Sequence, residues 1–124
     1  GGASVGGLMS LYAGAAHPNH WSCAIAMSGS WWWANLKTLS WLAGTPGAAS
    51  HPRLWLDAGT VKDGLGDTQA LRAKLIALGW SEGEGGTLGY FEAQGGDHSE
   101  SAWGARIHMA LQYLYDPKDR APAF

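Results

Sequence analysis

Hydrophobic positions follow a helical period in some stretches of the chain and form short continuous runs in others. Residues 5–16 place apolar side chains three and four positions apart, which predicts a helix, and Pro18 ends the pattern because proline cannot continue a helix. Residues 22–27 form a short run that is apolar after its first residue, Ser22, which is typical of a strand buried on both faces. Helix and strand signals thus alternate from the start of the chain.

The same two patterns recur further along the chain. They predict a short helix at residues 34–42, a strand at 53–58, a helix at 68–78, a strand at 88–93 and a final helix at 100–115. Alternation of this kind is typical of an α/β fold, in which right-handed crossovers join parallel strands. We therefore expect a single α/β domain over residues 1–124, with a mostly parallel sheet flanked by helices. Pro117 stops the last helix, and the tail to Phe124 is expected to be irregular.

Composition narrows the possible classes of function. Charged residues make up 15% of the chain and the formal net charge is -2, so there is no electrostatic case for binding nucleic acid or a membrane surface. No apolar run approaches the length of a transmembrane helix. The single cysteine, Cys23, excludes an internal disulfide and is expected to be a buried strand thiol. The cellular compartment and the oligomeric state stay open.

No metal or cofactor is expected. His17 and His20 lie three residues apart, but no third ligand is near them, so surface or capping histidines are the simpler interpretation. The sequence also contains no phosphate-binding loop and no cluster of metal ligands. The candidate chemistry therefore has to come from the side chains and backbone of the protein itself.

Residues 2–6 read G-A-S-V-G, the pattern of a nucleophile elbow. In such an elbow a serine stands at the tip of a sharp strand-to-helix turn, and we expect Gly2 and Gly6 to let the chain pass close to itself. Ser4 is the candidate nucleophile, and the N–H of Val5 is the candidate oxyanion donor. The pattern also arises by chance in a chain with 19 glycines, so the rest of the site has to support it.

Two aspartates and then a histidine follow Ser4, which gives the chain order serine, acid, histidine that one class of serine hydrolases uses. His98 lies in a glycine-flanked loop after the strand at 88–93, directly before a helix, where the base of a catalytic triad belongs. Asp57 and Asp63 lie at the end of the strand at 53–58 and in the loop after it, which is the place for the acid. We expect Asp67 to cap the next helix and Asp97 to have a loop or capping role.

The turn after the strand at 22–27 leads into three consecutive tryptophans. Ligands bind beyond the carboxyl ends of strands in open α/β sheets, so Trp31 and Trp32 are expected to line an aromatic substrate pocket. The alternative is that these tryptophans are packing residues beneath a lid. His51, which precedes a proline, is expected to be an exposed loop residue.

The start of the chain suggests that the domain is incomplete. An elbow needs a strand in front of it, and the second oxyanion donor of such hydrolases comes from a loop upstream of the elbow. We therefore expect the chain to be the C-terminal part of a larger domain. Alone, it would expose apolar strand edges and lack one oxyanion donor, so we expect it to be poorly soluble and a weak or inactive enzyme.

The assembled motifs resemble a family of esterases in the α/β-hydrolase superfamily. That family groups enterochelin (ferric siderophore) esterases, esterase D type enzymes, some feruloyl esterases and the mycolyltransferases, and the resemblance is greatest to the enterochelin esterases. It is carried by residues 2–8 (G-A-S-V-G-G-L), 11–14 (L-Y-A-G), 17–18 (H-P), 27–32 (M-S-G-S-W-W), 57–60 (D-A-G-T) and 95–98 (G-G-D-H), and by Trp103. It covers nearly the whole chain.

The resemblance implies that Ser4 is the nucleophile and His98 the base of an acyl-enzyme mechanism. Many relatives have a glutamate three residues after the loop glycine, where this chain has Lys62. Asp63, one residue later, matches the mycolyltransferase spacing, so we assign the acid to Asp63 and keep Asp57 as the alternative. The implied function is that of a serine carboxylic-ester hydrolase acting on small siderophore or aromatic esters.

Three other functions stay open at this point. Acyl transfer to an acceptor other than water, as in the mycolyltransferases, uses the same residues. A serine peptidase of the prolyl oligopeptidase type also has a glycine-rich serine elbow, but its fit to the acid loop and the tryptophans is poorer. The 8 tryptophans also suggest a non-catalytic carbohydrate-binding or scaffold module.

Overall fold

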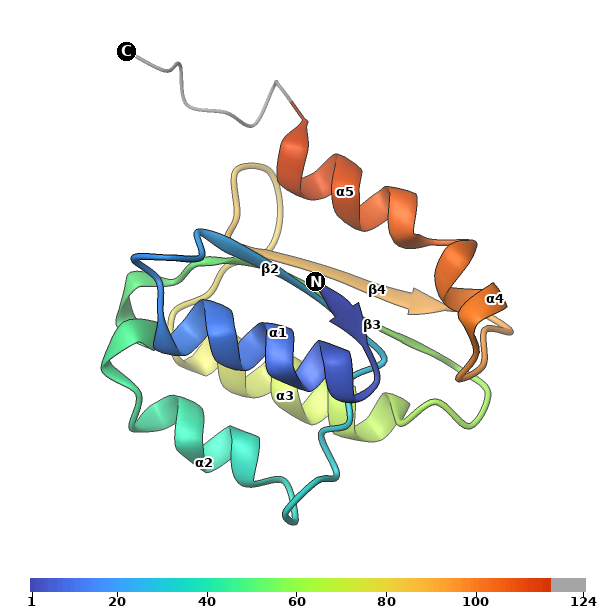
Figure 1. Cartoon of the computed structure of the whole chain (residues 1–124), viewed down its shortest axis with the longest axis horizontal. Coiled ribbons are helices and arrows are strands. Elements are labelled where there is room, and N and C mark those ends of the chain that lie inside the picture. Colours follow the sequence, from blue (N-terminus) through green and yellow to red (C-terminus); the bar gives the residue numbers. More distant parts are fainter. Residues whose placement is uncertain (117–124) are drawn as a thin grey trace.

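A computed structural model describes residues 1–116. Its centre is a parallel sheet with the strand order β1-β2-β3-β4, in which each strand pairs with the next one along the chain (Figure 1). The strands are β1 (Gly2–Ala3), β2 (Cys23–Met27), β3 (Arg53–Gly59) and β4 (Leu88–Ala93). The α/β class and the parallel sheet expected from the sequence are confirmed.

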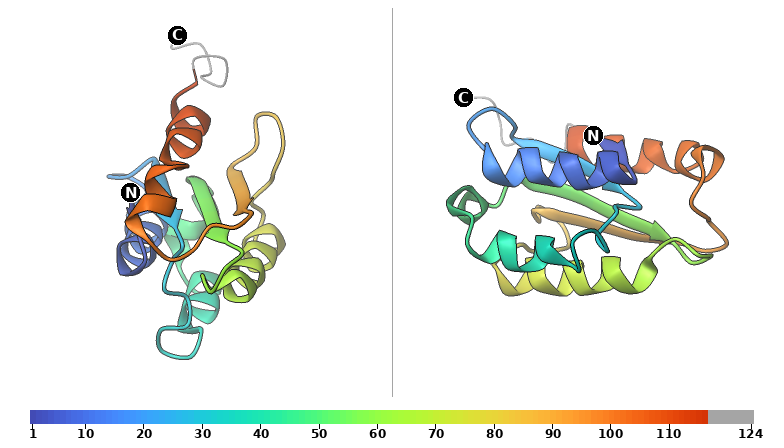
Figure 2. Two further views of the ribbon diagram at one scale, coloured as in Figure 1. Left: turned by 90° about the vertical axis from the view of Figure 1, so that its right-hand side faces the viewer. Right: turned by 60° about the horizontal axis from the view of Figure 1, so that its bottom comes forward.

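Helices cover both faces of the sheet. They are α1 (Val5–Ala16), α2 (Lys37–Ala43), the short 3-10 helix η1 (Pro46–Ser50), α3 (Leu65–Ala77), α4 (Glu100–Gly104) and α5 (Ile107–Tyr115). α1, α2, η1 and α3 pack on one face and α5 packs on the other, with the strands between them (Figure 2, left). Each crossover between neighbouring strands thus carries its own helix.

The two faces of the sheet have different cores because successive side chains of a strand point to opposite sides. In β2, Ala24 and Ala26 lie in the core beneath α1 and α3, whereas Ile25 and Met27 lie in the core beneath α5. The small alanines let α1 approach closely, and Gly14 of that helix sits directly over Ala24. Both faces are apolar, which explains why β2 appears in the sequence as an unbroken apolar run.

Several boundaries differ from the sequence-based expectation. The helix expected from residue 34 begins at Lys37, because Ala34, Asn35 and Leu36 form a left-handed turn with positive φ angles. α3 begins at Leu65 rather than at residue 68, and its N-cap is Gly64. Asp67 therefore does not cap it but lies in its first turn, where a negative charge favours the helix dipole.

The helix expected at residues 100–115 is two helices, α4 and α5. The chain breaks between them at Ala105 and Arg106, and the Arg106 side chain turns into the protein interior. Trp103 and Ile107 are partly buried and Leu114 is buried, but Leu111 is exposed, so the expected apolar stripe does not continue through that position. The expected tail beyond residue 116 lies outside the described residues.

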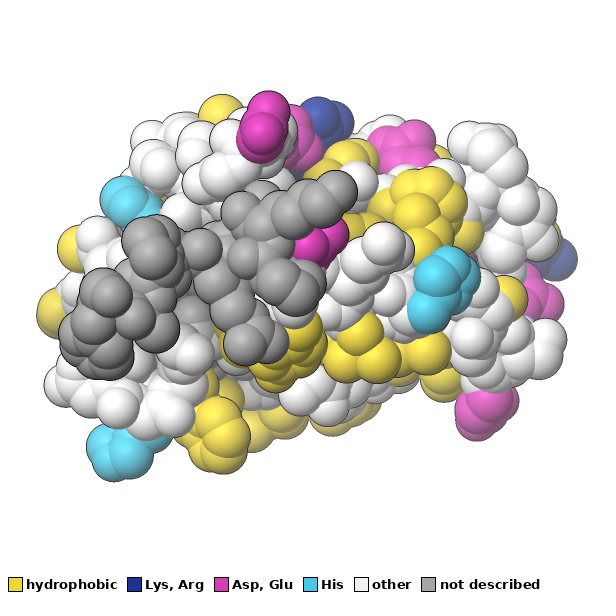
Figure 3. Space-filling view, turned by 90° about the horizontal axis from the view of Figure 1, so that it is seen from above, with side chains coloured by type: hydrophobic (Ala, Val, Ile, Leu, Met, Phe, Trp, Pro, Cys, Tyr) yellow, Lys and Arg dark blue, Asp and Glu magenta, His cyan; other side chains and the backbone are white. Residues whose placement is uncertain are grey.

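On the face shown in Figure 3, the charged side chains of the described residues are spread out and do not form one patch. Seen from above in Figure 3, acidic and basic side chains are scattered between polar and apolar ones on this face, and the described part of it has no cluster of lysines and arginines. Within residues 1–116, no helix is long and apolar enough to cross a membrane.

A matched pair of substitutions in α3 tests the core. Leu71 is fully buried and Ile76, on the same helix, is 45% exposed. Leu71→Ala should lower the free energy of unfolding by about 2–5 kcal/mol because it leaves a cavity under the sheet. Ile76→Ala should change it by less than about 1 kcal/mol. Urea unfolding curves measure both, and equal losses would contradict the described orientation of α3.

Candidate active site

The four loops that carry the candidate residues follow the carboxyl ends of the four strands. Ala3 pairs with Met27, Met27 with Asp57 and Asp57 with Phe91, so the strands end at a common edge. This is the edge at which open α/β sheets bind ligands.

Ser4 occupies a tight turn between β1 and α1. Its backbone has φ 58° and ψ -125°, a region that residues other than glycine rarely adopt, so the turn is strained. Backbone hydrogen bonds hold it there: the Ser4 N–H donates to the Met27 carbonyl at 3.0 Å, and the Ser4 carbonyl accepts from Ser30 N at 3.1 Å. The Ser4 hydroxyl is thereby presented at the strand-end edge.

The glycines around this turn differ in what they make room for. A Cβ on Gly2 would lie 2.7 Å from the carbonyl carbon of Gly6, so Gly2 is required for the close approach. A Cβ on Gly6 would meet nothing within 4 Å, whereas one on Gly7 would lie 3.0 Å from the Met27 carbonyl oxygen. The second crowded position is therefore Gly7 rather than the expected Gly6.

His98 comes from the loop after β4 and reaches both other candidate residues. Its Nε2 lies 2.9 Å from the Ser4 Oγ, and its Nδ1 lies 2.6 Å from Asp63 Oδ1. The His98 side chain is 42% exposed and the Asp63 side chain is fully buried. The structure thus brings Ser4, His98 and Asp63 together in one hydrogen-bonded chain.

The loops that carry His98 and Asp63 are tied to each other. The N–H of Val61 donates to the Gly96 carbonyl at 3.0 Å, and the N–H of Gly95 donates to the Thr60 Oγ1 at 3.0 Å. A Cβ on Gly59 would overlap the Gly96 carbonyl, so only glycine lets the two loops come this close.

Asp57, the alternative acid, is placed elsewhere. Its Oδ1 accepts hydrogen bonds from Arg106 Nη2 at 2.9 Å and Nε at 3.1 Å, and its Oδ2 accepts from Trp55 Nε1 at 2.7 Å. Both the Asp57 and the Arg106 side chains are almost completely buried. Asp57 is therefore the partner of a buried guanidinium, and Asp63 is the aspartate that contacts His98.

Val5 is the first residue of α1, directly after Ser4. The first N–H groups of a helix have no partner within that helix and point toward its N-terminal end. A second hydroxyl also lies beside Ser4: the Oγ of Ser30, which is buried, is 3.4 Å from the Ser4 Oγ.

The three tryptophans have three different environments. Trp31 is fully buried beneath the sheet and its Nε1 donates to the Thr68 Oγ1 at 3.2 Å, while Trp32 is 64% exposed. Neither of these two side chains lines the apolar cavity between α1 and α2, whereas Trp33 does. A substrate pocket at Trp31 and Trp32 therefore stays a prediction, and the tryptophan of this run that lines the apolar cavity is Trp33.

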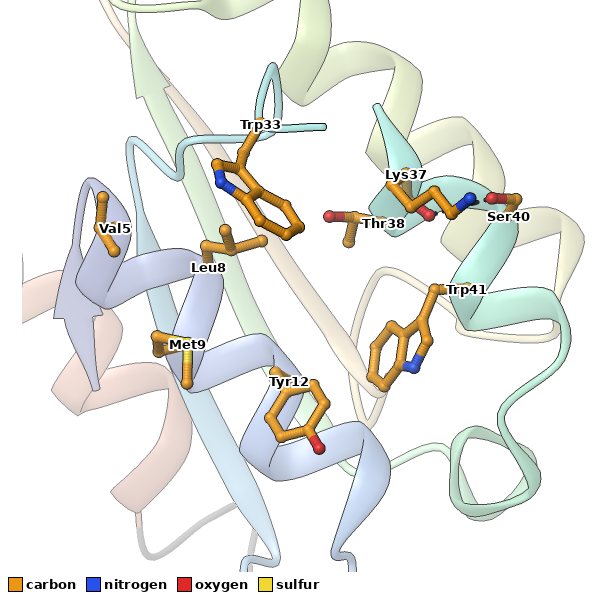
Figure 4. Close-up of a pocket in the computed structure, with 9 residues that line it drawn as sticks. All are labelled: Val5, Leu8, Met9, Tyr12, Trp33, Lys37, Thr38, Ser40 and Trp41. Atoms are coloured by element: carbon orange, nitrogen blue, oxygen red, sulfur yellow. Dashed lines mark hydrogen bonds between the residues drawn. The ribbon is translucent and has the colours of Figure 1, made fainter. Parts of the chain in front are cut away.

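The cavity lies between α1 and α2 and has a volume of about 770 Å³. It is largely apolar, and Figure 4 shows Trp33 and Trp41 on one side of it, facing Leu8 and Tyr12 of α1. Val5 is at one end of it, next in sequence to Ser4. The lining residues are Val5, Leu8, Met9, Tyr12, Trp33, Lys37, Thr38, Ser40 and Trp41.

The structure changes two further expectations, one about His51 and one about Cys23. His51 is not an exposed loop residue, because it is half-buried, its Nε2 lies 2.7 Å from the Leu78 carbonyl, and it packs edge-on against Trp80. Cys23 is a free thiol on β2 as expected, but it is only half-buried. Within residues 1–116, no group of three or more metal-ligating side chains comes together.

Tyr90 and Glu92 form the other notable titratable pair. Partial burial and the hydrogen bond to Glu92 raise the pKa of Tyr90 well above its ordinary value, and hydrogen bonds from Gln69 and Tyr90 lower the pKa of Glu92. Tyr90 therefore stays neutral and Glu92 stays ionised near neutral pH. Neither is suited to proton transfer there.

Sequence reasoning assigned no site role to Arg106, Ser28 or Trp103. The structure joins them by hydrogen bonds to one another and to Asp57 and Asp63. Arg106 had a detectable signal, because it is the only residue among Asp, Glu, Lys and Arg between residues 101 and 115. A lone charge in an amphipathic stretch that packs against a sheet indicates a buried partner.

No protein-family model and no curated protein matches the chain. Solved structures do: the enterobactin esterase of Shigella flexneri in the presence of 2,3-dihydroxy-N-benzoyl-serine matches with a TM-score of 0.76 and 28% identity, over 97% of this chain and 31% of that one. The same esterase in the presence of enterobactin matches with a TM-score of 0.74 and 29% identity, over 94% of this chain and 30% of that one.

The fold is that of an α/β-hydrolase. The sequence resemblance to the enterochelin esterases is thereby confirmed, since enterochelin is another name for enterobactin. The chain spans about a third of the length of these esterases. The four strands and the loops at their carboxyl ends thus correspond to part of an α/β-hydrolase domain.

Two glycine substitutions test how this α/β-hydrolase site is assembled. Gly59→Ala forces apart the loops that carry Asp63 and His98, and we expect it to lower the free energy of unfolding by about 1–3 kcal/mol. Gly66→Ala, in the first turn of α3 with nothing within 4 Å of its Cβ, should raise it by up to about 1 kcal/mol through helix propensity. Urea unfolding measures both, and a neutral Gly59→Ala would contradict the close approach of the loops.

Proposed function

We propose that the protein is a serine carboxylic-ester hydrolase in which Ser4 is the nucleophile, His98 the general base and Asp63 the acid. The observation that carries this proposal is the hydrogen-bonded chain from Ser4 Oγ through both nitrogens of His98 to Asp63 Oδ1. A nucleophile and base within hydrogen-bond reach, with the base oriented by a third group, is the signature of an activated serine. The likeness in fold to enterobactin esterase supports an esterase reaction in particular.

The reaction begins when His98 Nε2 takes the Ser4 proton and the Ser4 oxygen attacks the ester carbonyl carbon. The carbonyl becomes an oxyanion, which the N–H of Val5 stabilises at the start of α1. Collapse of this intermediate breaks the ester C–O bond, and His98 returns its proton to the departing alkoxide. Water then attacks the acyl-enzyme with His98 again as base, which releases the carboxylic acid and restores Ser4.

The strained backbone of Ser4 serves this chemistry. In its positive-φ conformation the hydroxyl lies on the side of His98, while the following helix points its free N–H groups toward the same region. Asp63, buried and hydrogen-bonded to Nδ1, orients the imidazole and stabilises the imidazolium that forms in the transition state.

Aromatic siderophore esters are the substrates that we propose. The solved relatives were obtained with enterobactin and with 2,3-dihydroxy-N-benzoyl derivatives of serine and glycine. The apolar cavity beside Val5, with Trp33 and Trp41 in its wall, offers flat aromatic surfaces of the kind on which an aryl group packs.

Replacement of the nucleophile is the first test. Ser4→Ala should lower kcat on p-nitrophenyl butyrate and on enterobactin by on the order of a thousandfold or more, because the acyl-enzyme cannot form. A fluorophosphonate probe should label the parent protein and Ser50→Ala, an exposed serine control, but not Ser4→Ala. Full activity in Ser4→Ala would refute the proposal, and a dominant ester product with an added alcohol acceptor would identify a transferase instead.

The two aspartates should separate into an acid and a structural residue. Asp63→Asn should lower kcat by on the order of 100- to 10,000-fold, because the tautomer of His98 is no longer fixed. Asp57→Asn leaves the buried Arg106 charge without its main partner and should lower the free energy of unfolding by about 3–5 kcal/mol. Steady-state kinetics and urea unfolding measure both effects. A larger loss of kcat in Asp57→Asn, compared at a temperature where both variants are folded, would assign the acid to Asp57.

A further inference from the structure

Ser28 occupies the turn after β2, where it contacts both the buried Asp63 carboxylate and the buried Arg106 guanidinium. Its Oγ lies 2.5 Å from Asp63 Oδ2, 2.9 Å from Trp103 Nε1 and 2.7 Å from Arg106 Nη2. Ser28 itself is almost fully buried, at 1% exposure. One hydroxyl thus joins the aspartate of the candidate triad to an arginine and a tryptophan.

The direction of each of these hydrogen bonds follows from valence. An indole N–H and a guanidinium can only donate, and a serine hydroxyl has one proton and two lone pairs. Trp103 and Arg106 therefore occupy both lone pairs of the Ser28 oxygen. The single Ser28 proton has only one direction left, toward Asp63 Oδ2.

The same constraint continues to the histidine. Asp63 Oδ2 accepts from both Ser28 Oγ and the Gly59 N–H, so this oxygen is held by two donors. Asp63 Oδ1 is thereby aimed at His98 Nδ1, which has to carry the proton of that hydrogen bond. His98 Nε2 is then the unprotonated nitrogen that faces Ser4.

We propose that Ser28 is a positioning residue, whose hydroxyl, fixed as a donor to Asp63 by Arg106 and Trp103, selects the tautomer in which His98 can act as a base toward Ser4. This inference rests on the proposed function for its catalytic meaning. Trp103 also holds His98 directly. Its ring packs edge-on against the His98 imidazole, with ring centroids 5.0 Å apart and an interplanar angle of 86°. The Ser28 hydroxyl thus connects Arg106 and Trp103 to Asp63, and Asp63 in turn contacts His98.

Deleting the hydroxyl is the test, with Thr68→Val as a matched control. Thr68 is also a fully buried hydroxyl that accepts a tryptophan N–H, that of Trp31, but it lies on α3 and contacts none of the three triad candidates. Ser28→Ala should lower kcat on p-nitrophenyl butyrate about fivefold to tenfold at an unchanged KM, the worth of roughly one hydrogen bond. Thr68→Val should lower the thermal midpoint but leave kcat unchanged.

A double variant separates positioning from stability. Ser28→Ala leaves the Trp103 N–H buried without an acceptor, whereas Ser28→Ala combined with Trp103→Phe removes both partners and should recover part of the thermal midpoint. If Ser28 positions Asp63, kcat in the double variant stays below that of Trp103→Phe alone. If kcat recovers together with the thermal midpoint, the role of Ser28 is structural and the proposal is wrong.

Nitrogen NMR of the histidine side chains gives a readout that does not depend on activity. The chain has five histidines, and a His98→Gln spectrum identifies the signals of His98. The parent protein should show His98 as the Nδ1–H tautomer, and Ser28→Ala should add the Nε2–H form. Ester hydrolysis tests the proposed function, while these spectra decide the tautomer whether or not the protein hydrolyses an ester. Identical His98 signals in the parent and in Ser28→Ala would overturn the inference.

Discussion

A single buried guanidinium connects the parts of the site. Arg106 lies where α4 ends and α5 begins, and it reaches Asp57 on β3, Ser28 after β2 and the carbonyl of Ala102. A buried charge is tolerated only when it is paired and hydrogen-bonded, so the surrounding groups have to be arranged around it. The break between α4 and α5 and the burial of Asp57 both follow from that requirement.

The sequence predicted the parts of the fold that local rules determine. The helix at residues 5–16 and the strands at 22–27 and 88–93 appeared almost at their observed limits, because their apolar patterns match the two core faces. Ser4, His98 and Asp63 were predictable for a related reason. Each follows the end of a parallel strand, and the ends of neighbouring parallel strands meet.

The features that the sequence did not predict depend on contacts between distant residues. The sequence ranked Asp63 above Asp57 only through the spacing of a resembling family, whereas the structure separates their contacts: Asp57 pairs with Arg106, 49 residues further along the chain, and Asp63 contacts His98. Trp31 and Trp33 are likewise identical residues in one run of the sequence. Only the folded chain shows that Trp31 is buried and that Trp33 lines the cavity. The sequence could not show that Gly7 is more crowded than Gly6, because the crowding comes from the carbonyl of Met27, a residue of β2.

The left-handed turn at residues 34–36 has a consequence for how the protein can diversify. None of Ala34, Asn35 and Leu36 is glycine, and a left-handed conformation costs an ordinary residue about 1–2 kcal/mol. This strain lies in the segment between Trp33 and Lys37, two residues that line the cavity, and outside the loops that follow β1, β3 and β4. Glycine or asparagine at Ala34 or Leu36 would relieve strain, as Asn35 already does at its own position, while Ser4, Asp63 and His98 stay unchanged. The chain therefore separates a cavity wall that substitution can remodel from the hydrogen-bonded chain of Ser4, His98 and Asp63, which depends on close contacts between loops.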